Sequence, residues 1–203
     1  MKVRSVLLAL SLAAAVAHPA AAKPAQTTQY AYYTISGDSA VEVYNAMISK
    51  GPRVNGAKAY AATSATTTQD GKLLQASSCQ IKDYRLKLDF TIKLPRIKNE
   101  KVLPSGERNR WQQFQAFLKK HEETHRAIWL GCAADLERQV KAIKVKSCAD
   151  ADKKATQLWN KVRAACSKKH EAFDAAEQKN LMKHPFVQMV YRRATQKHAA
   201  AAQ

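Results

Sequence analysis

The chain has 203 residues, of which 34 are lysine or arginine and 16 are aspartate or glutamate, so its formal net charge is +18. That length fits one domain, or at most two small ones, and is enough to bury a core. With 46% hydrophobic and 25% charged residues, the composition excludes a disordered or collagen-like chain. The excess positive charge raises the question of whether binding to a polyanion is the function.

The first 22 residues have the pattern of a secretory signal peptide. Lys2 and Arg4 form a positive region, residues 6–16 are apolar except for Ser11, and Ala20-Ala21-Ala22 is a small-residue cleavage site. We therefore expect cleavage after Ala22 and an exported protein, either periplasmic or secreted. No later stretch reaches the roughly 18 apolar residues of a membrane-spanning helix, so we do not expect an integral membrane protein.

Export changes what the positive charge implies. Outside the cytoplasm nucleic acid is not an expected partner, whereas anionic envelope surfaces and acidic polymers are. The basic residues are scattered along the chain and are not interleaved with aromatic residues as in a nucleic-acid stacking platform. A solvated basic surface is the simpler interpretation, and a polyanion site is its alternative.

Export also gives the cysteines a meaning. An even number of cysteines in an oxidising compartment predicts two disulfides, with three possible pairings of Cys79, Cys132, Cys148 and Cys166. No C-x-x-C sequence occurs, so neither a zinc knuckle nor a thioredoxin-type redox site is indicated.

The first part of the chain predicts strands around one helix. Residues 30–35 are aromatic and β-branched, which is typical of a strand. Ser39 and Glu42 form a capping box that starts a helix, and Gly51-Pro52 ends it. Residues 60–68 are small and threonine-rich, which favours a strand there.

The clearest strand signal lies at residues 85–94, after an expected turn at residues 69–71. Apolar and polar side chains alternate along it, which marks one buried and one wet face. The apolar set is Leu86, Leu88, Phe90, Ile92 and Leu94. We expect Pro95 to end this strand and residues 96–107 to form a polar connector.

The second half predicts two long helices, over about 108–146 and 150–183, with helical spacing of their apolar residues. The short connection between them predicts an antiparallel hairpin. The predicted fold class is therefore α+β: a small antiparallel N-terminal sheet with one helix, followed by a long helical hairpin. We expect a single domain over residues 23–190 and a frayed tail over 191–203.

The first helix of the hairpin carries His121-Glu122-Glu123-Thr124-His125, an H-E-x-x-H sequence. Histidines four residues apart lie one above the other on a helix and can bind one Zn²⁺. Glu122 is then placed to act as general base toward a water that the metal activates. The alternative is a helix with two inward histidines that hydrogen-bond to their neighbours.

The hairpin narrows the search for a third ligand. If the chain turns back near Cys148, residues equally far from the turn lie opposite each other, because both helices rise about 1.5 Å per residue. Residues 121–125 of the first helix then lie opposite residues about 171–175 of the second. The acidic and histidine side chains at or near that level are His170, Glu171, Asp174 and Glu177. His184 lies about 15 Å too far along a straight helix.

Equal rise along the two helices also relates the cysteines. Cys132 and Cys166 are nearly equally far from the turn and so lie opposite each other. We therefore predict that they pair, and that Cys79 pairs with Cys148. A different offset of the hairpin would cross these pairs.

Further motifs, spread over most of the chain after the signal peptide, resemble a bacterial family of predicted secreted zinc-dependent proteases that is catalogued as a domain of unknown function. They are Tyr32-Tyr33-x-Ile35-x-Gly37 with Ser39-Ala40, Lys50-Gly51-Pro52, Ala59-Tyr60-Ala61-x-Thr63, Cys79, Leu94-Pro95, Trp111-x-x-Phe114 and the H-E-x-x-H sequence. The resemblance implies an exported metallopeptidase.

The chain departs from the usual end of that family, an aromatic-Asp pair followed by Thr and by His-Gly. Phe173-Asp174 keeps the pair, but Glu177 stands for the Thr and Lys179-Asn180 for the His-Gly. In the predicted hairpin Asp174 lies opposite the two histidines, so we predict it as the third ligand, with His170 and Glu177 as alternatives. The alternative for Asp174 is a solvated carboxylate on the helix surface.

The sequence thus predicts an exported peptidase with one Zn²⁺ held by His121, His125 and Asp174, with Glu122 as catalytic base and a protein or peptide as substrate. The alternative is a non-enzymatic, disulfide-stapled envelope protein with a structural or vestigial metal site and a basic surface that binds anionic polymers.

Overall fold

The structure is a computed structural model that describes residues 24–201, so the expected signal peptide, residues 1–22, lies outside the described range. The fold is α+β, as predicted. The elements in chain order are β1 (Ala25–Ile35), α1 (Ala40–Lys50), β2 (Arg53–Val54), β3 (Ala57–Lys58), β4 (Ala62–Gln75), β5 (Cys79–Ile97), a 3₁₀ turn (Glu100–Val102), α2 (Ser105–Lys141), β6 (Lys144–Val145), α3 (Cys148–Lys183) and α4 (Pro185–Ala201).

The sheet is mixed, which corrects the expected antiparallel sheet. β5 is its central strand, with β1 parallel to it on one side and β4 antiparallel to it on the other. β6 adds a short antiparallel pairing at the start of β5. β1 reaches β5 only after α1 and β4 have intervened, and a crossover of this length allows a parallel pair, whereas a hairpin does not.

The buried face of β5 is the one that the alternation predicts. Its five apolar side chains are at most 2% exposed (Leu86, Leu88, Phe90, Ile92 and Leu94). The strand does not end at Pro95 but continues to Ile97. β4 no longer flanks β5 there, since its first residue, Ala62, pairs with Lys93. The missing N–H of Pro95 therefore interrupts no ladder on that side.

β4 also passes through a predicted turn. Residues 69–71 lie inside the strand, where the register shifts between Asp70 and Lys72, and the hairpin instead turns between Gln75 and Cys79. An irregularity of this kind accommodates an extra residue without reversing the chain. A glycine after an aspartate therefore marks a bulge here.

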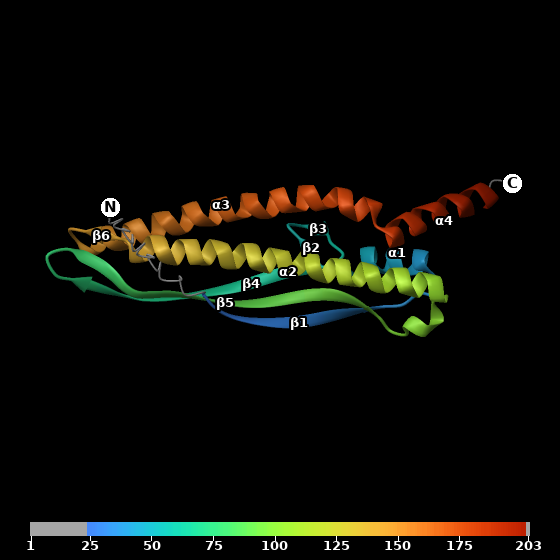
Figure 1. The fold of residues 1–203 in the computed structure, drawn as a ribbon, viewed down its shortest axis with the longest axis horizontal. Coiled ribbons are helices and arrows are strands. Elements are labelled where there is room, and N and C mark those ends of the chain that lie inside the picture. The colour runs from blue at the N-terminus through green and yellow to red at the C-terminus, as the bar shows by residue number, and fades with distance from the viewer. Residues whose placement is uncertain (1–23, 202–203) are drawn as a thin grey trace, which may run out of the picture.

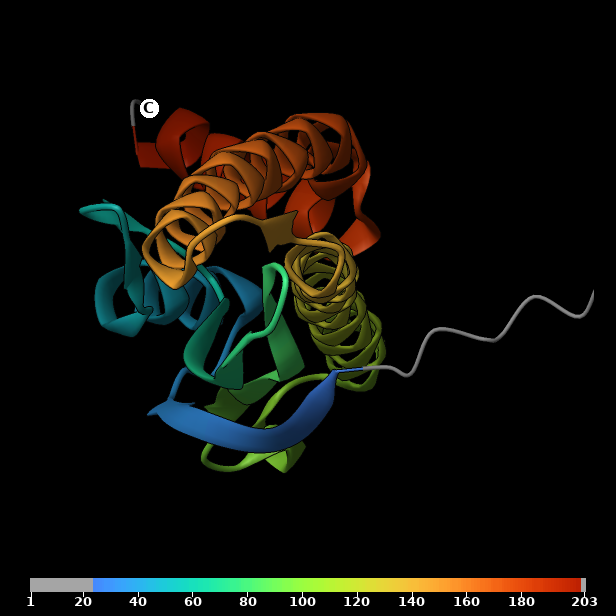
Figure 2. The same cartoon turned by 90° about the vertical axis from the view of Figure 1, so that its left-hand side faces the viewer.

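The two long helices lie side by side (Figure 1), and in the view along them α2 packs at one side of the sheet while α3 lies above the sheet (Figure 2). α2 begins at Ser105 rather than 108 and ends at Lys141 rather than 146, because the following residues form β6. α3 runs from Cys148 to Lys183 behind an N-cap in which Ser147 accepts from the Asp150 amide at 3.1 Å. Within residues 24–201, no helix combines the length and apolarity needed to cross a bilayer.

The interior consists of two hydrophobic clusters, one toward each end of α2. The first cluster joins α1, α4 and the start of α2, and it includes Trp111, Phe114 and Leu118. The second lies under the β4–β5 hairpin and includes Leu136 and Val140 of α2. Residues 119–128 of α2, which include the H-E-x-x-H sequence, lie between the two clusters.

The C-terminal segment is helical through Ala201, and the last two residues of the expected tail over 191–203 lie outside the described range. Phe186 and Val190 are buried in the first cluster. Arg193 then forms an ion pair with the buried Glu107, whose other carboxylate oxygen accepts from the Ala40 amide at 2.6 Å. These contacts hold α4 against α1 and α2.

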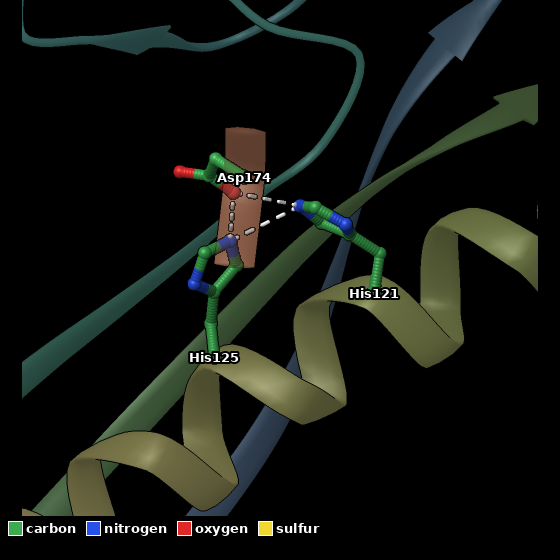
Figure 3. Close-up of side chains that lie close together, drawn as sticks. All are labelled: His121, His125 and Asp174. Atoms are coloured by element: carbon green, nitrogen blue, oxygen red, sulfur yellow. Dashed lines mark hydrogen bonds and ion pairs between the residues drawn. The ribbon is translucent and has the colours of Figure 1, made fainter. Parts of the chain in front are cut away.

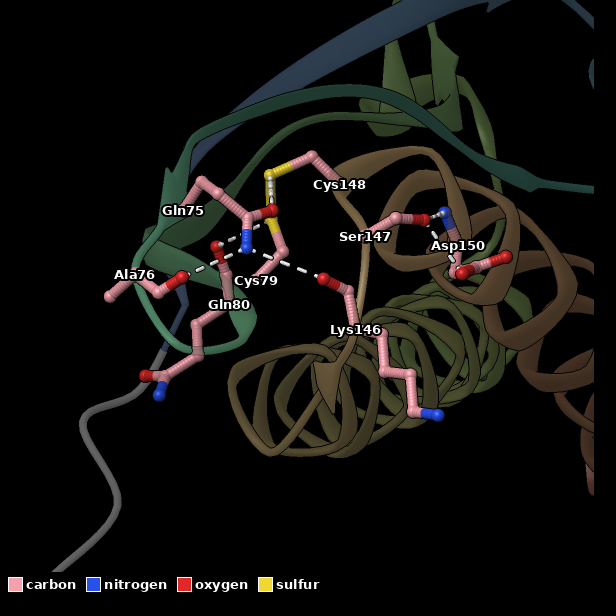
Figure 4. The surroundings of a disulfide bond; sticks show 8 residues. All are labelled: Gln75, Ala76, Cys79, Gln80, Lys146, Ser147, Cys148 and Asp150. Carbon is pink, nitrogen blue, oxygen red and sulfur yellow. Dashed lines mark hydrogen bonds between the residues drawn. A yellow bond between two sulfur atoms is a disulfide. The ribbon is translucent and has the colours of Figure 1, made fainter.

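Two disulfides join the helices to the rest of the fold. Cys79–Cys148 links the start of β5 to the start of α3 (Figure 4), and Cys132–Cys166 links α2 to the middle of α3. Beside the first disulfide, the Gln75 amide donates to the Lys146 carbonyl at 3.3 Å. Both pairs are those predicted from the equal rise of the two helices, and two disulfides are consistent with an exported protein.

Candidate metal centre

Three potential ligands converge from two helices. His121 and His125 project from α2, and Asp174 projects from α3 toward them (Figure 3). The Asp174 Oδ1 atom lies 3.3 Å from His121 Nε2 and 2.9 Å from His125 Nε2. The two Nε2 atoms are 3.0 Å apart. His121 and His125 are four residues apart on α2, and Asp174 lies opposite them on α3. One carboxylate and two imidazoles therefore meet at one point.

The donor set fits a divalent cation such as zinc. Zn²⁺ binds imidazole nitrogen and carboxylate oxygen at about 2.0–2.2 Å, so neighbouring ligands of a tetrahedral site lie about 3.3–3.5 Å apart. The three ligand atoms here are 2.9–3.3 Å from one another, slightly closer than that. Two histidines and one carboxylate are also the protein ligands of one class of catalytic zinc site, which keeps its fourth position for water or substrate.

Partial burial favours the neutral form of both imidazoles. Their partial burial lowers the pKa of His121 and of His125 below the ordinary histidine value, against the opposing charge of Asp174. The neutral ring is the form that binds a metal. Phe173 closes one side of the pair, with its ring centroid 4.8 Å from that of His121 and 5.1 Å from that of His125.

His170 lies behind His125 rather than among the ligands. Its Nδ1 is 2.8 Å from the Nδ1 of His125, the nitrogen that points away from Asp174. When His125 donates its Nδ1 proton to His170, its Nε2 carries the lone pair that a metal needs. The other nitrogen of His170 is 3.8 Å from Cys166 Sγ, so the Cys132–Cys166 disulfide supports this arrangement from α3.

Glu122 is buried on the sheet side of the cluster, with only 4% of its surface exposed. The Thr63 hydroxyl of β4 donates to its Oε2 at 2.8 Å and lies 3.0 Å from its main-chain oxygen. Burial raises the pKa of Glu122 from 4.5 to about 7, while the Thr63 hydrogen bond opposes the rise and the charge of Asp174 adds to it. The side chain is thus a carboxyl group able to exchange a proton near neutral pH.

A cleft of about 1150 Å³ contains the cluster. α2 and α3 form two of its walls, and the segment from Val54 to Thr63 forms the third. Its volume is slightly above the usual range for small-molecule pockets, about 300–1,000 Å³. Apolar side chains line the end nearest the first hydrophobic cluster, and these are Ile48, Val54, Phe117, Leu118 and Leu181.

The other candidate ligands do not join the cluster. Glu177 lines the cleft but accepts from the Asn180 amide at 2.7 Å. Glu171 is exposed and accepts from Ser167 at 3.0 Å. His184 ends α3 and packs against Phe114 at a centroid distance of 5.0 Å, in the first hydrophobic cluster.

Residues 30–182 match the family described as "Bacterial protein of unknown function (DUF922)". The chain belongs to this family. No curated protein and no solved structure gives a significant match. The family description assigns no activity, so any function for the chain has to be argued from its site.

Sequence reasoning did not identify Thr63 as the partner of Glu122. The residue lies in a run of small and threonine side chains, and the motif Ala59-Tyr60-Ala61-x-Thr63 marks it without indicating that it contacts Glu122. His170 was considered as a ligand, whereas the structure places it against the far nitrogen of a ligand. Equal rise along the two helices fixes the height of a residue in the hairpin but not the rotation of the helix that carries it.

Proposed function

We propose that the chain is a zinc-dependent peptidase whose metal is held by His121, His125 and Asp174. The observation that carries this proposal is the convergence of the three ligand atoms beside a buried glutamate in an open cleft. When bound, Zn²⁺ supplies Lewis-acid chemistry, since it polarises a carbonyl and lowers the pKa of water.

Glu122 is the general base of the proposed reaction. Among the described residues, the hydrogen bonds to its side chain engage Oε2 only, through Thr63. Oε1 is therefore available to accept a proton from the attacking water and to return it to the leaving amine. A carboxyl group with a pKa of about 7 can perform both transfers near neutral pH.

Asp174 and His170 hold the two imidazoles in place. Asp174 reaches both histidines while 54% of its side chain remains exposed, so the centre stays open to the cleft. His170 fixes the tautomer of His125 by its contact with Nδ1. The cleft is long enough along α2 and α3 to receive a stretch of polypeptide on both sides of the centre.

The test is zinc content and peptide hydrolysis by the purified, oxidised chain, compared with Glu122→Gln. We expect one zinc per chain in both proteins, and activity that a chelator removes and added zinc restores. Loss of the base is expected to reduce kcat by about 10²–10⁴-fold while zinc stays bound.

Glu171→Gln is the matched control, because Glu171 lines the same cleft but is exposed and outside the cluster. It is expected to keep both zinc and activity. If wild-type protein retained zinc but cleaved no member of a broad peptide set, the peptidase proposal would be wrong and a structural metal site would remain.

A further inference from the structure

A second, smaller cavity adjoins the metal cleft. Its volume is about 180 Å³, and it lies among α2, α3 and the sheet, within the second hydrophobic cluster. Apart from Thr67 and Arg163, its walls are apolar: Leu86, Leu88, Trp129, Cys132, Ala133, Leu136, Trp159, Val162 and Cys166. The set includes two of the three tryptophans of the chain and the Cys132–Cys166 disulfide.

The cavity is set in a rigid part of the fold. Leu86 and Leu88, each 1% exposed, come from the central strand. The disulfide bridges α2 and α3 across the cavity wall and fixes their separation at that level, with the Cα atoms 6.0 Å apart. A cavity between elements that are held apart in this way does not close by a small shift of α3.

The cavity and the metal cleft share the side chains of Trp129 and Arg163 in their walls. Trp129 follows His125 by one helical turn, which is about 6 Å along α2. Its ring centroid lies 5.0 Å from that of His170, which contacts His125. The near wall of the cavity, formed by Trp129, thus lies about two residues of an extended peptide from the ligand His125, at about 3.3 Å per residue, and the rest of the cavity extends beyond it toward Leu136.

We propose that this cavity is a specificity pocket that binds a large apolar side chain, aromatic or branched aliphatic, of the peptide held at the metal centre. The proposal rests on the proposed peptidase function and names the class of its substrate. A peptide side chain that enters the cavity past Trp129 therefore belongs to a residue about two positions from the bond to be cleaved. Successive side chains of an extended peptide alternate in direction, so residues two apart point the same way.

The size and chemistry of the cavity match such a side chain. An apolar protein cavity of about 150 Å³ stays dry and binds benzene, so 180 Å³ holds one aromatic ring or a leucine-sized group. A charged side chain would lose its hydration there, because the walls offer few polar partners. The pocket is therefore expected to select against charged residues as well as to favour apolar ones.

The binding test uses Glu122→Gln protein loaded with zinc, with N-acetylphenylalaninamide as probe and N-acetylglycinamide as its control. The emission of Trp129 and Trp159 is expected to change saturably with the phenylalanine probe and not with the glycine probe. Val162→Phe fills the cavity from α3 and Thr67→Phe fills it from β4, so both are expected to weaken binding at least tenfold.

Val145→Phe is the matched control. Val145 is half-buried against the same hydrophobic cluster but does not line the cavity, so its replacement is expected to leave binding intact. Because the two filling variants lie on different elements, misfolding of one element cannot account for a shared loss.

The hydrolysis test uses peptides in which phenylalanine, leucine, glycine or aspartate occupies each position near the cleaved bond. One position about two residues away is expected to show a 10- to 200-fold preference in kcat/KM for phenylalanine or leucine, which Val162→Phe abolishes. Cleavage without such a preference would overturn the pocket and keep the peptidase. Saturable probe binding without any cleavage would overturn the peptidase function but keep an apolar binding site. Absence of both would overturn both.

Discussion

Replacing Glu122 by glutamine is expected to stabilise the metal-free protein in a pH-dependent way. Burial gives the folded protein a Glu122 pKa of about 7, against an ordinary value of 4.5. Between these values the folded chain binds more protons than the unfolded chain, so stability falls as pH rises through this interval. Glutamine carries no charge at any pH, and its amide oxygen can still accept from Thr63.

The size of the effect follows from the two pKa values. Ionising Glu122 in the folded protein above pH 7 costs about 3 kcal/mol, since each pH unit between 4.5 and about 7 corresponds to 1.36 kcal/mol. This is the expected gain of Glu122→Gln at about pH 8, and it falls below about 1 kcal/mol at about pH 5. At about 2–4 °C per kcal/mol, Tm at the higher pH should rise by about 6–12 °C.

The assay is urea denaturation of chelator-treated wild type and Glu122→Gln with both disulfides intact, at the two pH values. Glu171→Gln, which removes an exposed carboxylate from the same cleft, is expected to show no such gain. Zinc should reduce the advantage of Glu122→Gln, because a nearby cation favours the ionised glutamate. An equal gain at both pH values, or no gain at the higher one, would refute the assignment of a buried, desolvated carboxyl group.

Three further predictions concern the support of the site and of the fold. His170→Ala should weaken zinc binding about 10- to 100-fold by isothermal titration, whereas His184→Ala, outside the cluster, should not. Replacing Cys132 and Cys166 together by serine should lower the free energy of unfolding by about 4 kcal/mol, because the bond closes a loop with a sequence separation of 34; an unchanged urea midpoint would contradict this. Glu107→Ala should cost about 3 kcal/mol, because it leaves the amide at the start of α1 and an arginine of α4 without their buried partner, and Glu107→Gln should cost less.

The features that could be predicted from sequence are those set by local periodicity. The alternation along β5 identified its buried face, and Ser39 with Glu42 marked the start of α1, where Ser39 accepts from the Glu42 amide. Equal rise along two antiparallel helices was enough to bring Asp174 level with the two histidines of α2. These inferences need only the geometry of one element or of one short connection.

The features that could not be predicted depend on contacts between distant segments. The parallel pairing of β1 with β5 joins residues about 60 positions apart, such as Thr28 with Phe90, and no local signal specifies its direction. A proline is tolerated at position 95 of β5 because the neighbouring strand β4 does not extend that far. The sequence does not show where β4 ends, so Pro95 was expected to end the strand. The ion pair that holds α4 against α2 joins Glu107 and Arg193, which are 86 residues apart, and no local signal identifies such a partner.

α3 is a 36-residue helix in which only Ala151 and Cys166 are buried. Its other apolar contacts, such as those of Leu158, Trp159 and Val162, are only partly buried, so the two disulfides at its start and its middle are an important part of its attachment. Because Asp174 is on α3 and the two histidines are on α2, thiol oxidation and metal affinity are thermodynamically linked. Oxidation assembles the ligand set, and a bound metal in turn favours the oxidised chain. A metal ion at this site is thus expected to bind more tightly to the oxidised chain than to the reduced one.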